Sequence, residues 1–366
     1  MGQIVLSGVN LIELGPVVVF RSALQAAVDL FGADYEIVAL VHRKELFSVP
    51  GVRYIEFPDV KSSWLKRLRF EYFTLKSLSR ELDADLWLSM HDMTPNVVAR
   101  RRAVYCHNAV PFYLLRVREA LANWEFAAWV LLYKYLYCIN IHKNNFVIVQ
   151  QDWLRGEFER RYRLNNVIVA HPVSEVGTIR PEATALAKDQ QFRFFYPAFP
   201  RLFKNHELIL NAVHILESEG NFDFEVWLTL DAQTSPYAKS LVTRFKHLRT
   251  VKWLGVLAHS AVLERYSHSD CLLFPSKLET WGLPITEFKV TGRPIIAVDL
   301  PYARETVGTY EQVAFTPVDD PSHLAELMKS AIRGDKVFAK VQGLPIAPPF
   351  AKNWHELWKL LLPESL

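Results

Sequence analysis

Short apolar runs alternate along this chain with longer amphipathic segments, and this alternation constrains the fold more than any other feature. In the first half, strands are predicted at residues 3–8, 36–41, 52–57, 86–90, 103–108 and 146–150. Helical patterns lie between most of these runs, at residues 20–31, 64–82 and 113–137. Strands that alternate with helices in this way predict a parallel sheet covered by helices.

The alternation starts again after a turn-like stretch at residues 170–181. Further strands are predicted at 192–197, 224–230, 251–255, 271–275 and 294–298, with helices at 206–219, 236–247, 259–268 and 284–291. The chain has 366 residues, which is too long for one ordinary core. We therefore predict an α/β protein of two tandem Rossmann-like domains, residues 1–172 and 173–345, that face a cleft.

Composition and charge narrow the class of protein. Half of the residues are apolar and the formal net charge is +3, which by itself gives no argument for nucleic acid as a partner. Cys106, Cys138 and Cys271 form no paired framework, as expected of a reduced, cytoplasmic protein. The opening MGQIVLSGVN has neither a basic nor a long apolar region, so no signal peptide is predicted. The apolar stretch 126–139 is short for a membrane span.

Two carboxylates flank a predicted strand-to-helix turn in the second half, in the stretch LETWGLPITEFKVTGRPIIA. Glu279 lies in the loop that leaves the strand, and Glu287 lies about one turn into the helix. Gly282 and Pro284 suit a close backbone approach and a first helical turn. Two lone glutamates would be explained by the helix dipole, but the whole pattern is more specific. Because ligands bind beyond the carboxyl ends of parallel strands, both side chains are expected to face a cleft.

This stretch resembles a known family. ETWGLPITE is similar to the Glu-x7-Glu motif of retaining family-4 glycosyltransferases of the GT-B fold, with Trp281 as an aromatic variant. YPAFPRLFKNHELILNAVHIL (196–216) resembles the first strand–loop–helix of that family's C-terminal domain. The tandem organisation also matches, although the N-terminal half matches mostly by layout. The resemblance implies that residues 346–366, with the amphipathic pattern NWHELWKLLL, form a helix that crosses back to the N-terminal domain.

The resemblance also implies roles in binding a nucleotide-sugar donor, a UDP- or GDP-sugar. Glu287 would bind the ribose hydroxyls, and Glu279 would contact hydroxyls of the transferred sugar. The backbone would approach the sugar and the diphosphate at Gly282, Leu283 and Pro284.

Two basic residues, Lys204 and Arg201, would hold the diphosphate. In many family members an Arg precedes the Lys by about five residues, but Phe199 occupies that position here and Arg201 is three residues before Lys204. Lys204 therefore fits the family pattern better than Arg201 does. Lys and Arg stabilise the charge of a leaving diphosphate without a proton transfer. The alternative for both is a solvated loop charge.

In the N-terminal half, polar residues follow the predicted strands. The family has a histidine close to the reacting sugar, and His107, followed by Asn108, occupies that place; the alternative is a histidine of the core. His91 and Asp92, which also follow a predicted strand, are expected to line the acceptor side together with Asn108. Gly15, just before a predicted helix, is the counterpart of the family's glycine loop near the donor phosphates, or it only forms a turn.

No metal site and no cofactor are expected. Asp83 and Asp85 imitate an Asp-x-Asp metal motif, but they precede a strand and belong at the opposite edge of the sheet. No His and Cys cluster has the spacing of a metal site either.

The resemblance therefore implies a retaining, metal-independent, hexosyltransferase-like enzyme. It would move a sugar to a hydroxyl of a saccharide acceptor, free or lipid-linked, in surface polysaccharide assembly. A nucleotide-sugar epimerase on the same fold and a non-catalytic sugar-nucleotide-binding assembly protein remain alternatives. A phosphorylase of this fold would need a larger chain.

Residues 61–80 contain six basic residues and one acid, interleaved with aromatic residues. Such a basic amphipathic helix either lies on an anionic bilayer or presents an ordinary solvated face. The first alternative would place a cytoplasmic enzyme peripherally on the inner face of the membrane.

Overall fold

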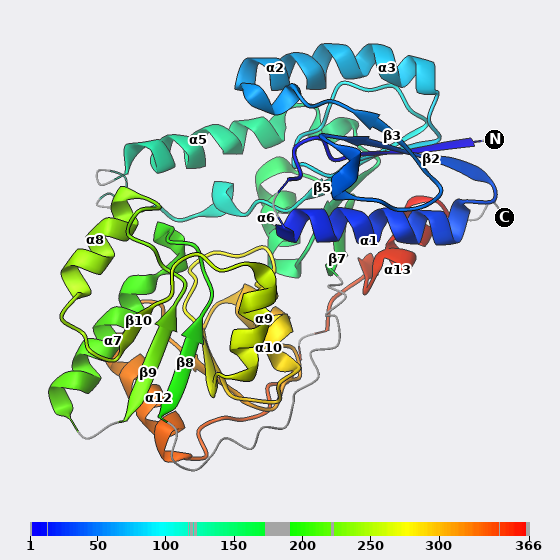
Figure 1. The fold of residues 1–366 in the computed structure, drawn as a ribbon. Coiled ribbons are helices and arrows are strands. Elements are labelled where there is room, and N and C mark those ends of the chain that lie inside the picture. The colour runs from blue at the N-terminus through cyan, green and yellow to red at the C-terminus, as the bar shows by residue number, and fades with distance from the viewer. Residues whose placement is uncertain are drawn as a thin grey trace. The chain divides into compact units, whose positions relative to one another are not determined.

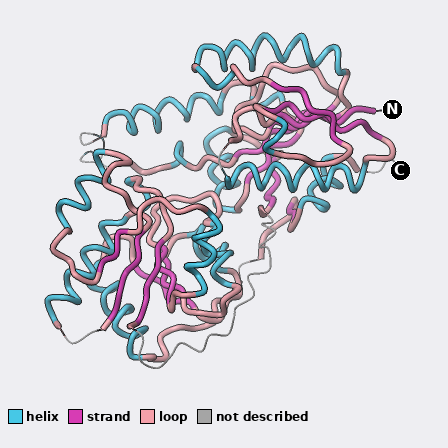
Figure 2. Tube along the Cα trace, in the orientation of Figure 1, coloured by secondary structure: helices cyan, strands magenta, loops and turns pink. Residues whose placement is uncertain are grey.

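The computed structural model describes residues 2–12, 14–115, 117, 120, 123–172, 191–220, 223–343 and 345–363. The chain divides into two compact units, residues 1–174 with 346–366 and residues 175–345. In each unit a parallel sheet lies among helices, which confirms the predicted α/β class with two Rossmann-like domains (Figures 1 and 2).

The described part of the N-terminal unit contains an eight-stranded sheet in the order β14-β7-β6-β5-β4-β1-β2-β3, with parallel neighbours throughout. Its strands are β1 (Gly2–Ser7), β2 (Tyr35–Val41), β3 (Val52–Glu56), β4 (Leu86–Ser89), β5 (Arg101–Cys106), β6 (Phe146–Val149), β7 (Val167–Ala170) and β14 (Phe350–Ala351). The chain runs outward from β1 to β3 on one side and from β4 to β7 on the other. The strand order therefore reverses between β1 and β4, which is where open α/β sheets bind ligands.

The helices of this unit cover both faces of the sheet. They are α1 (Leu14–Phe31), α2 (Trp64–Arg69), α3 (Leu75–Leu82), α5 (Trp124–Cys138), α6 (Asp152–Tyr162) and α13 (Trp354–Leu361), with short turns η1 (Lys44–Leu46), η2 (Val60–Ser62), η4 (Val110–Phe112) and η5 (Ile141–Lys143). Alternate residues of β1 face different cores: Ile4 packs with α1 and α13, whereas Val5 packs with the α2–α3 segment. Helix α13 lies against α1, where the Trp358 indole donates to the Ala23 carbonyl at 3.1 Å.

Three helices of this unit differ from their predicted bounds. Helix α1 begins at Leu14, earlier than predicted. The predicted helix 64–82 is interrupted by a π-helical turn, η3 (Phe70–Thr74), which turns Glu71 into the core. Helix α5 begins only at Trp124, because Asn123 caps it by accepting from the Phe126 N–H at 3.0 Å; residues 113–115 are not helical.

The described part of the C-terminal unit contains a six-stranded sheet in the order β10-β9-β8-β11-β12-β13. Its strands are β8 (Phe192–Tyr196), β9 (Phe224–Leu228), β10 (Val251–Trp253), β11 (Cys271–Phe274), β12 (Ile295–Val298) and β13 (Val313–Thr316). Its helices are α7 (His206–Glu219), α8 (Pro236–Phe245), α9 (His259–Ser267), α10 (Leu283–Lys289), α11 (Pro301–Val307) and α12 (Pro321–Arg333), with the turn η6 (Leu202–Lys204). Here the strand order reverses between β8 and β11.

Candidate active site

The reversal of the C-terminal sheet brings together two of the predicted site residues. Lys204 ends η6, the turn that follows β8, and Glu279 lies in the loop that follows β11. The Lys204 Nζ and Glu279 Oε1 atoms are 2.5 Å apart, and both side chains are largely buried. A charged pair with this little water around it interacts more strongly than a surface pair does.

The loop that carries Lys204 is fixed by buried hydrogen bonds. The Tyr196 hydroxyl donates to the Lys204 carbonyl at 2.7 Å, and burial raises the Tyr196 pKa well above its usual value, so the group remains a donor. Asn205 adopts a left-handed conformation, and its amide donates to the carbonyls of Pro275 and Val318 at 3.2 and 2.9 Å. Asn205 therefore ties the loop after β8 to the loop after β11, a role that sequence reasoning missed.

Glu287 is buried and both of its carboxylate oxygens have partners. The Tyr266 hydroxyl donates to Oε2 at 2.9 Å, and His259 Nε2 lies 3.0 Å from Oε1. Burial, followed by the charge of Glu287, raises the Tyr266 pKa well above its usual value. Sequence reasoning missed His259 and Tyr266, because they precede Glu287 by 28 and 21 residues.

The turn between the two glutamates needs its glycine. Gly282 caps α10 with φ +88°, a left-handed conformation that side chains rarely adopt. A Cβ atom there would lie 3.2 Å from the ring of Phe274. Leu283 begins α10 and Pro284 lies in its first turn, as predicted for this stretch.

Arg201 is placed differently from Lys204. It lies at the start of η6 with an exposed side chain, and its guanidinium is 6.0 Å from the centre of the Phe203 ring. Lys204, and not Arg201, carries the contact with Glu279.

In the N-terminal unit, Asp92 holds the loop that contains His107 and Asn108. Its Oδ1 atom accepts from the N–H groups of His107 and Asn108 at 2.7 and 3.0 Å, and from the Tyr137 hydroxyl at 2.9 Å. The Tyr133 hydroxyl donates to Oδ2 at 3.2 Å. Asp92 is therefore a buried anchor rather than an open acceptor-side residue, whereas the His107 side chain is 24% exposed.

His91 does not line an open surface either, because it is buried beneath the loop after β1. Its Nε2 atom lies 3.2 Å from Ser7 Oγ and 3.5 Å from Glu71 Oε1, and Arg67 donates to its carbonyl. Burial, followed by the charge of Arg67, lowers the pKa of His91 to about 3. Burial raises the pKa of Glu71 to about 8. Burial thus favours the uncharged form of both groups, although the geometry of their contact is that of an ion pair.

Gly15 lies inside the first turn of α1 and not in the loop before it, so its expected place is wrong, while its role near the donor phosphates stays a prediction. The loop after β1 contains another glycine with a packing role. A Cβ atom on Gly8 would come within 2.6 Å of the Phe20 ring, which leaves no room for a side chain.

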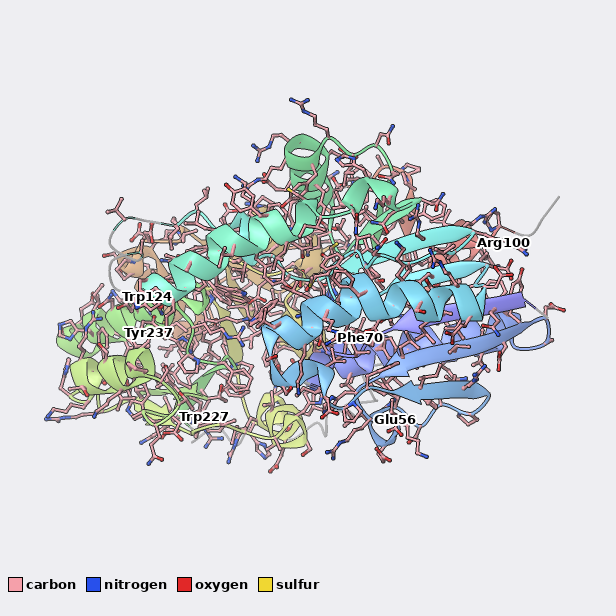
Figure 3. All side chains as sticks on the ribbon, turned by 90° about the horizontal axis from the view of Figure 1, so that it is seen from above. Glu56, Phe70, Arg100, Trp124, Trp227 and Tyr237 are labelled. Carbon is pink, nitrogen blue, oxygen red and sulfur yellow. The ribbon has the colours of Figure 1, made fainter. Side chains whose placement is uncertain are left out.

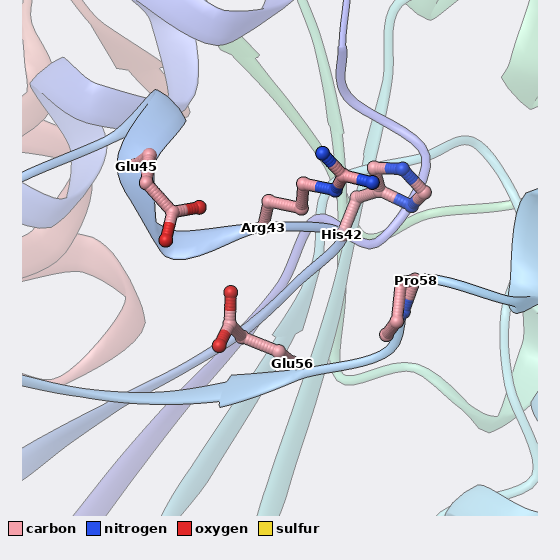
Figure 4. Close-up of a pocket in the computed structure, with 5 residues that line it drawn as sticks. All are labelled: His42, Arg43, Glu45, Glu56 and Pro58. Carbon is pink, nitrogen blue, oxygen red and sulfur yellow. The ribbon is translucent and has the colours of Figure 1, made fainter.

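A polar pocket of about 360 Å³ lies at the carboxyl ends of β2 and β3 (Figure 4). It is lined by His42, Arg43, Glu45, Glu56 and Pro58. The Lys44 N–H donates to Glu56 Oε1 at 2.8 Å and so joins the two loops. Charged groups of both signs suit a ligand that is rich in hydroxyl groups, and sequence reasoning did not single out this place.

Asp83 and Asp85 are structural. Asp83 ends α3 in a left-handed conformation, and Asp85 accepts from the Gln3 N–H at 3.1 Å and pairs with Arg100 at 2.6 Å. Both precede β4, at the amino ends of the strands.

Within the described ranges, no three His, Cys, Asp or Glu side chains lie together as metal ligands. No helix of the described chain is long and apolar enough to cross a bilayer.

Comparisons with known proteins agree with this arrangement. The family model of glycosyl transferases group 1 matches residues 178–341. A glycosyltransferase from Rickettsia africae ESF-5 superposes with a TM-score of 0.69 at 14% identity, over 100% of this chain and 99% of that one. Sucrose-phosphate synthase from Thermosynechococcus elongatus gives 0.65 at 15% identity, over 99% and 95%. HepE from Anabaena, in complex with UDP and glucose, gives 0.60 at 14% identity, over 99% and 95%.

No curated protein sequence matches the chain. At these low identities the solved structures establish the fold, and the family model establishes the kinship of the C-terminal unit. Both agree with the resemblance to glycosyltransferases of the GT-B fold. Residues 178–341 thus match the family model of glycosyl transferases group 1, and the whole chain has the two-domain fold of the GT-B glycosyltransferases.

Proposed function

We propose that this protein is a retaining glycosyltransferase that moves a sugar from a UDP- or GDP-sugar to a hydroxyl of a saccharide in surface polysaccharide assembly. The observation that carries the proposal is the Lys204–Glu279 pair at the reversal of the C-terminal sheet, with Glu287 on the helix that follows. Relatives of this fold have been crystallised with UDP and with UDP-glucose, which supports a nucleotide-sugar donor.

In this reaction the bond between C1 of the sugar and the diphosphate oxygen breaks, and the acceptor oxygen bonds to C1 on the same face while its proton passes to an oxygen of the departing diphosphate. Negative charge then grows on the departing diphosphate. Lys204 would stabilise that charge, because its Nζ is held at a fixed place by Glu279 and by the anchored loop around it. Glu279 would keep a second oxygen for hydroxyls of the transferred sugar.

Glu287 would accept hydrogen bonds from the ribose hydroxyls. Tyr266 orients the carboxylate from the buried side, whereas His259 is about half exposed. A ribose hydroxyl would therefore donate to Glu287 Oε1, either together with His259 or in its place. This assigns His259 to the nucleotide site as well.

In the N-terminal unit, His107 would contact the reacting sugar, and Asn108 and the pocket around Glu56 would serve the acceptor. The partial exposure of His107 on a loop fixed by Asp92 supports this role. A lipid-linked acceptor would agree with peripheral binding of residues 61–80 to an anionic bilayer.

A nucleotide-release assay over a panel of UDP- and GDP-sugars, with and without oligosaccharide acceptors, tests the proposal. Release of nucleotide that requires an acceptor, with a product of the donor's anomeric configuration by NMR, is the expected result. Conversion of the sugar with the donor alone would indicate an epimerase. Tight nucleotide binding without turnover of any donor would indicate a non-catalytic binding protein.

A further inference from the structure

Helix α5 is apolar around most of its circumference, with Glu125 and Lys134 as its only charged residues, but is buried on only one side. Val130, Tyr133 and Tyr137 face the core of the N-terminal unit. On the opposite side, at least 60% of each residue is exposed at Trp124, Leu131, Leu132 and Tyr135. This spacing places the exposed residues in one stripe along the helix. A helix with so few charged residues is normally buried, and an exposed apolar stripe usually marks an interaction site. We therefore expect the outer stripe of α5 to contact a partner.

The α2 segment adds a second set of exposed apolar side chains, Trp64, Leu65 and Phe73. Figure 3, which views the molecule from above, shows α5 near the label of Trp124 and the α2–α3 segment near the label of Phe70, both as outer helices of the N-terminal unit. Both sets therefore lie on the outside of this unit. We call Trp64, Leu65, Phe73, Trp124, Leu131, Leu132 and Tyr135 the outer helical face.

Exposed positive charges accompany the outer helical face. Lys66, Arg69 and Lys76 on the α2–α3 segment are exposed, and so is Lys134 on α5. The acid within residues 61–80 does not offset them, because Glu71 is fully buried and burial raises its pKa. Apolar and aromatic side chains beside basic ones fit a bilayer surface, where aromatic rings lie at the headgroup level.

We propose that the outer helical face docks on an anionic lipid bilayer, with the exposed stripe of α5 seated at the boundary between headgroups and acyl chains. The basic side chains would bind anionic headgroups, while Trp124, Leu131, Leu132 and Tyr135 would replace water with lipid. This goes beyond the charge pattern of residues 61–80, because it makes α5 the apolar anchor. The proposal depends on neither the donor nor the reaction.

The chain offers a native probe for this docking. Cys138, the last residue of α5, is exposed, whereas Cys106 and Cys271 are buried and burial raises the pKa of both thiols well above the usual value. A thiol-reactive, environment-sensitive fluorophore should therefore label Cys138 selectively. The helical spacing from Leu131 and Tyr135 places Cys138 on the same stripe.

The test titrates the labelled protein with vesicles of equal parts phosphatidylglycerol and phosphatidylcholine. A blue shift that weakens as salt is added is expected. The double substitution Leu131→Asp and Leu132→Asp should reduce the apparent partition coefficient by about tenfold or more. Lys66→Glu with Arg69→Glu should reduce it as well, and Lys239→Glu with Lys246→Glu, on exposed positions of the C-terminal unit, serves as the matched control.

A second control moves the probe to the other side of the sheet. With Cys138→Ser and Lys359→Cys, the label lies on an exposed position of α13, which packs with α1 against the opposite core, and it should show no blue shift. No shift at Cys138, or an equal shift with pure phosphatidylcholine, would overturn the proposal. A third result would also overturn it. If the molecular mass rose with protein concentration in the absence of vesicles, and the label on Cys138 shifted to the blue at the same time, the partner of this face would be a second copy of the chain. None of these outcomes would affect nucleotide release.

Discussion

Single residues at the ends of the strands fix the geometry of the candidate site, and two of them are carboxylates. Glu279 holds Lys204, and Asp92 holds the backbone of His107 and Asn108. The resemblance assigned Lys204 to the diphosphate and Glu279 to the transferred sugar, but it did not indicate that the two side chains pair with each other. The anchoring role of Asp92 could not be predicted, because its partners are backbone groups and tyrosines about 15 to 45 residues away in sequence.

Lys204 gives the first prediction. Lys204→Met removes the positive charge nearest Glu279 and keeps most of the apolar stem, so kcat should fall by about 10²- to 10³-fold. Lys204→Arg should restore part of the activity, because the charge returns on a longer side chain. Nucleotide-release rates measure both. The matched control Lys239→Met, on exposed α8, should keep normal rates, and normal rates in Lys204→Met would exclude the lysine from catalysis.

His107 gives a second prediction that separates a catalytic role from a structural one. His107→Ala should lower kcat by roughly 10²-fold or more, as expected when a positioned contact to a transition state is lost. Nucleotide affinity and Tm should remain nearly unchanged, since the nucleotide contacts are assigned to the other unit and the side chain is partly exposed. Asp92→Ala should instead lower Tm, because it releases four hydrogen-bond donors. A stable His107→Ala enzyme with normal turnover would contradict the assignment.

Among the elements, the predicted strands and helices are present, but the sequence patterns did not predict α6, α11, α12 or β13. Helix α7 matches its predicted bounds, and the eleven predicted strands are present within a few residues. β14 has two residues, too few for a pattern, and β7 lies beside the predicted turn at 170–181. The start of α5 depends on the cap at Asn123, while the π-helical turn η3, with its i→i+5 hydrogen bonds, interrupts the helical period at a segment that has no Gly or Pro to mark it.

The π-helical turn carries a prediction of pH dependence, because it buries Glu71. Folding raises the Glu71 pKa from 4.5 to about 8, so the folded state binds the proton more tightly and stability falls as the pH rises through this range. Folding lowers the pKa of His91 and His206 from 6.5 to about 3, so stability rises with pH between these values. Above pH 6.5 the effect of Glu71 remains, and Tm should fall from there towards pH 8.

The substitution Glu71→Gln isolates this effect. Glutamine keeps the shape and does not titrate, so the fall in Tm between pH 6.5 and 8 should become smaller or disappear. Scanning calorimetry over this pH range measures it. Glu125→Gln, on the exposed start of α5, is the control and should keep the parent profile. A Glu71→Gln profile identical to that of the parent would show that Glu71 is not protonated in the folded protein.

For the whole molecule, the restart of the strand–helix pattern predicted two α/β units, and the model and the solved relatives confirm them. The last helix, α13, packs in the N-terminal unit, where Trp358 is fully buried against α1. Sequence periodicity could show that this helix is amphipathic, but only the resemblance said which unit it joins. Local sequence patterns show which face of a helix is apolar, but they do not show which part of the protein that face packs against.

Metal independence is a prediction for the whole enzyme. Lys204 can stabilise the charge of the leaving diphosphate without a metal ion, because Glu279 holds its Nζ in place. Turnover should therefore persist in excess EDTA, measured by nucleotide release after dialysis against the chelator. Loss of turnover that manganese or magnesium restores would show that the charge is supplied by a metal ion.

The most direct test of the account asks whether the C-terminal unit binds the nucleotide through Glu287. Calorimetric titration of UDP and GDP into the parent protein and into Glu287→Ala makes this measurement, with Tm confirming that the variant is folded. Loss of a charged hydrogen-bonding partner should cost about 1.5–3 kcal/mol, or roughly ten- to hundredfold in Kd. Tyr266→Phe, which keeps the carboxylate, should weaken binding less. A folded Glu287→Ala protein that binds the nucleotide as tightly as the parent would contradict the account.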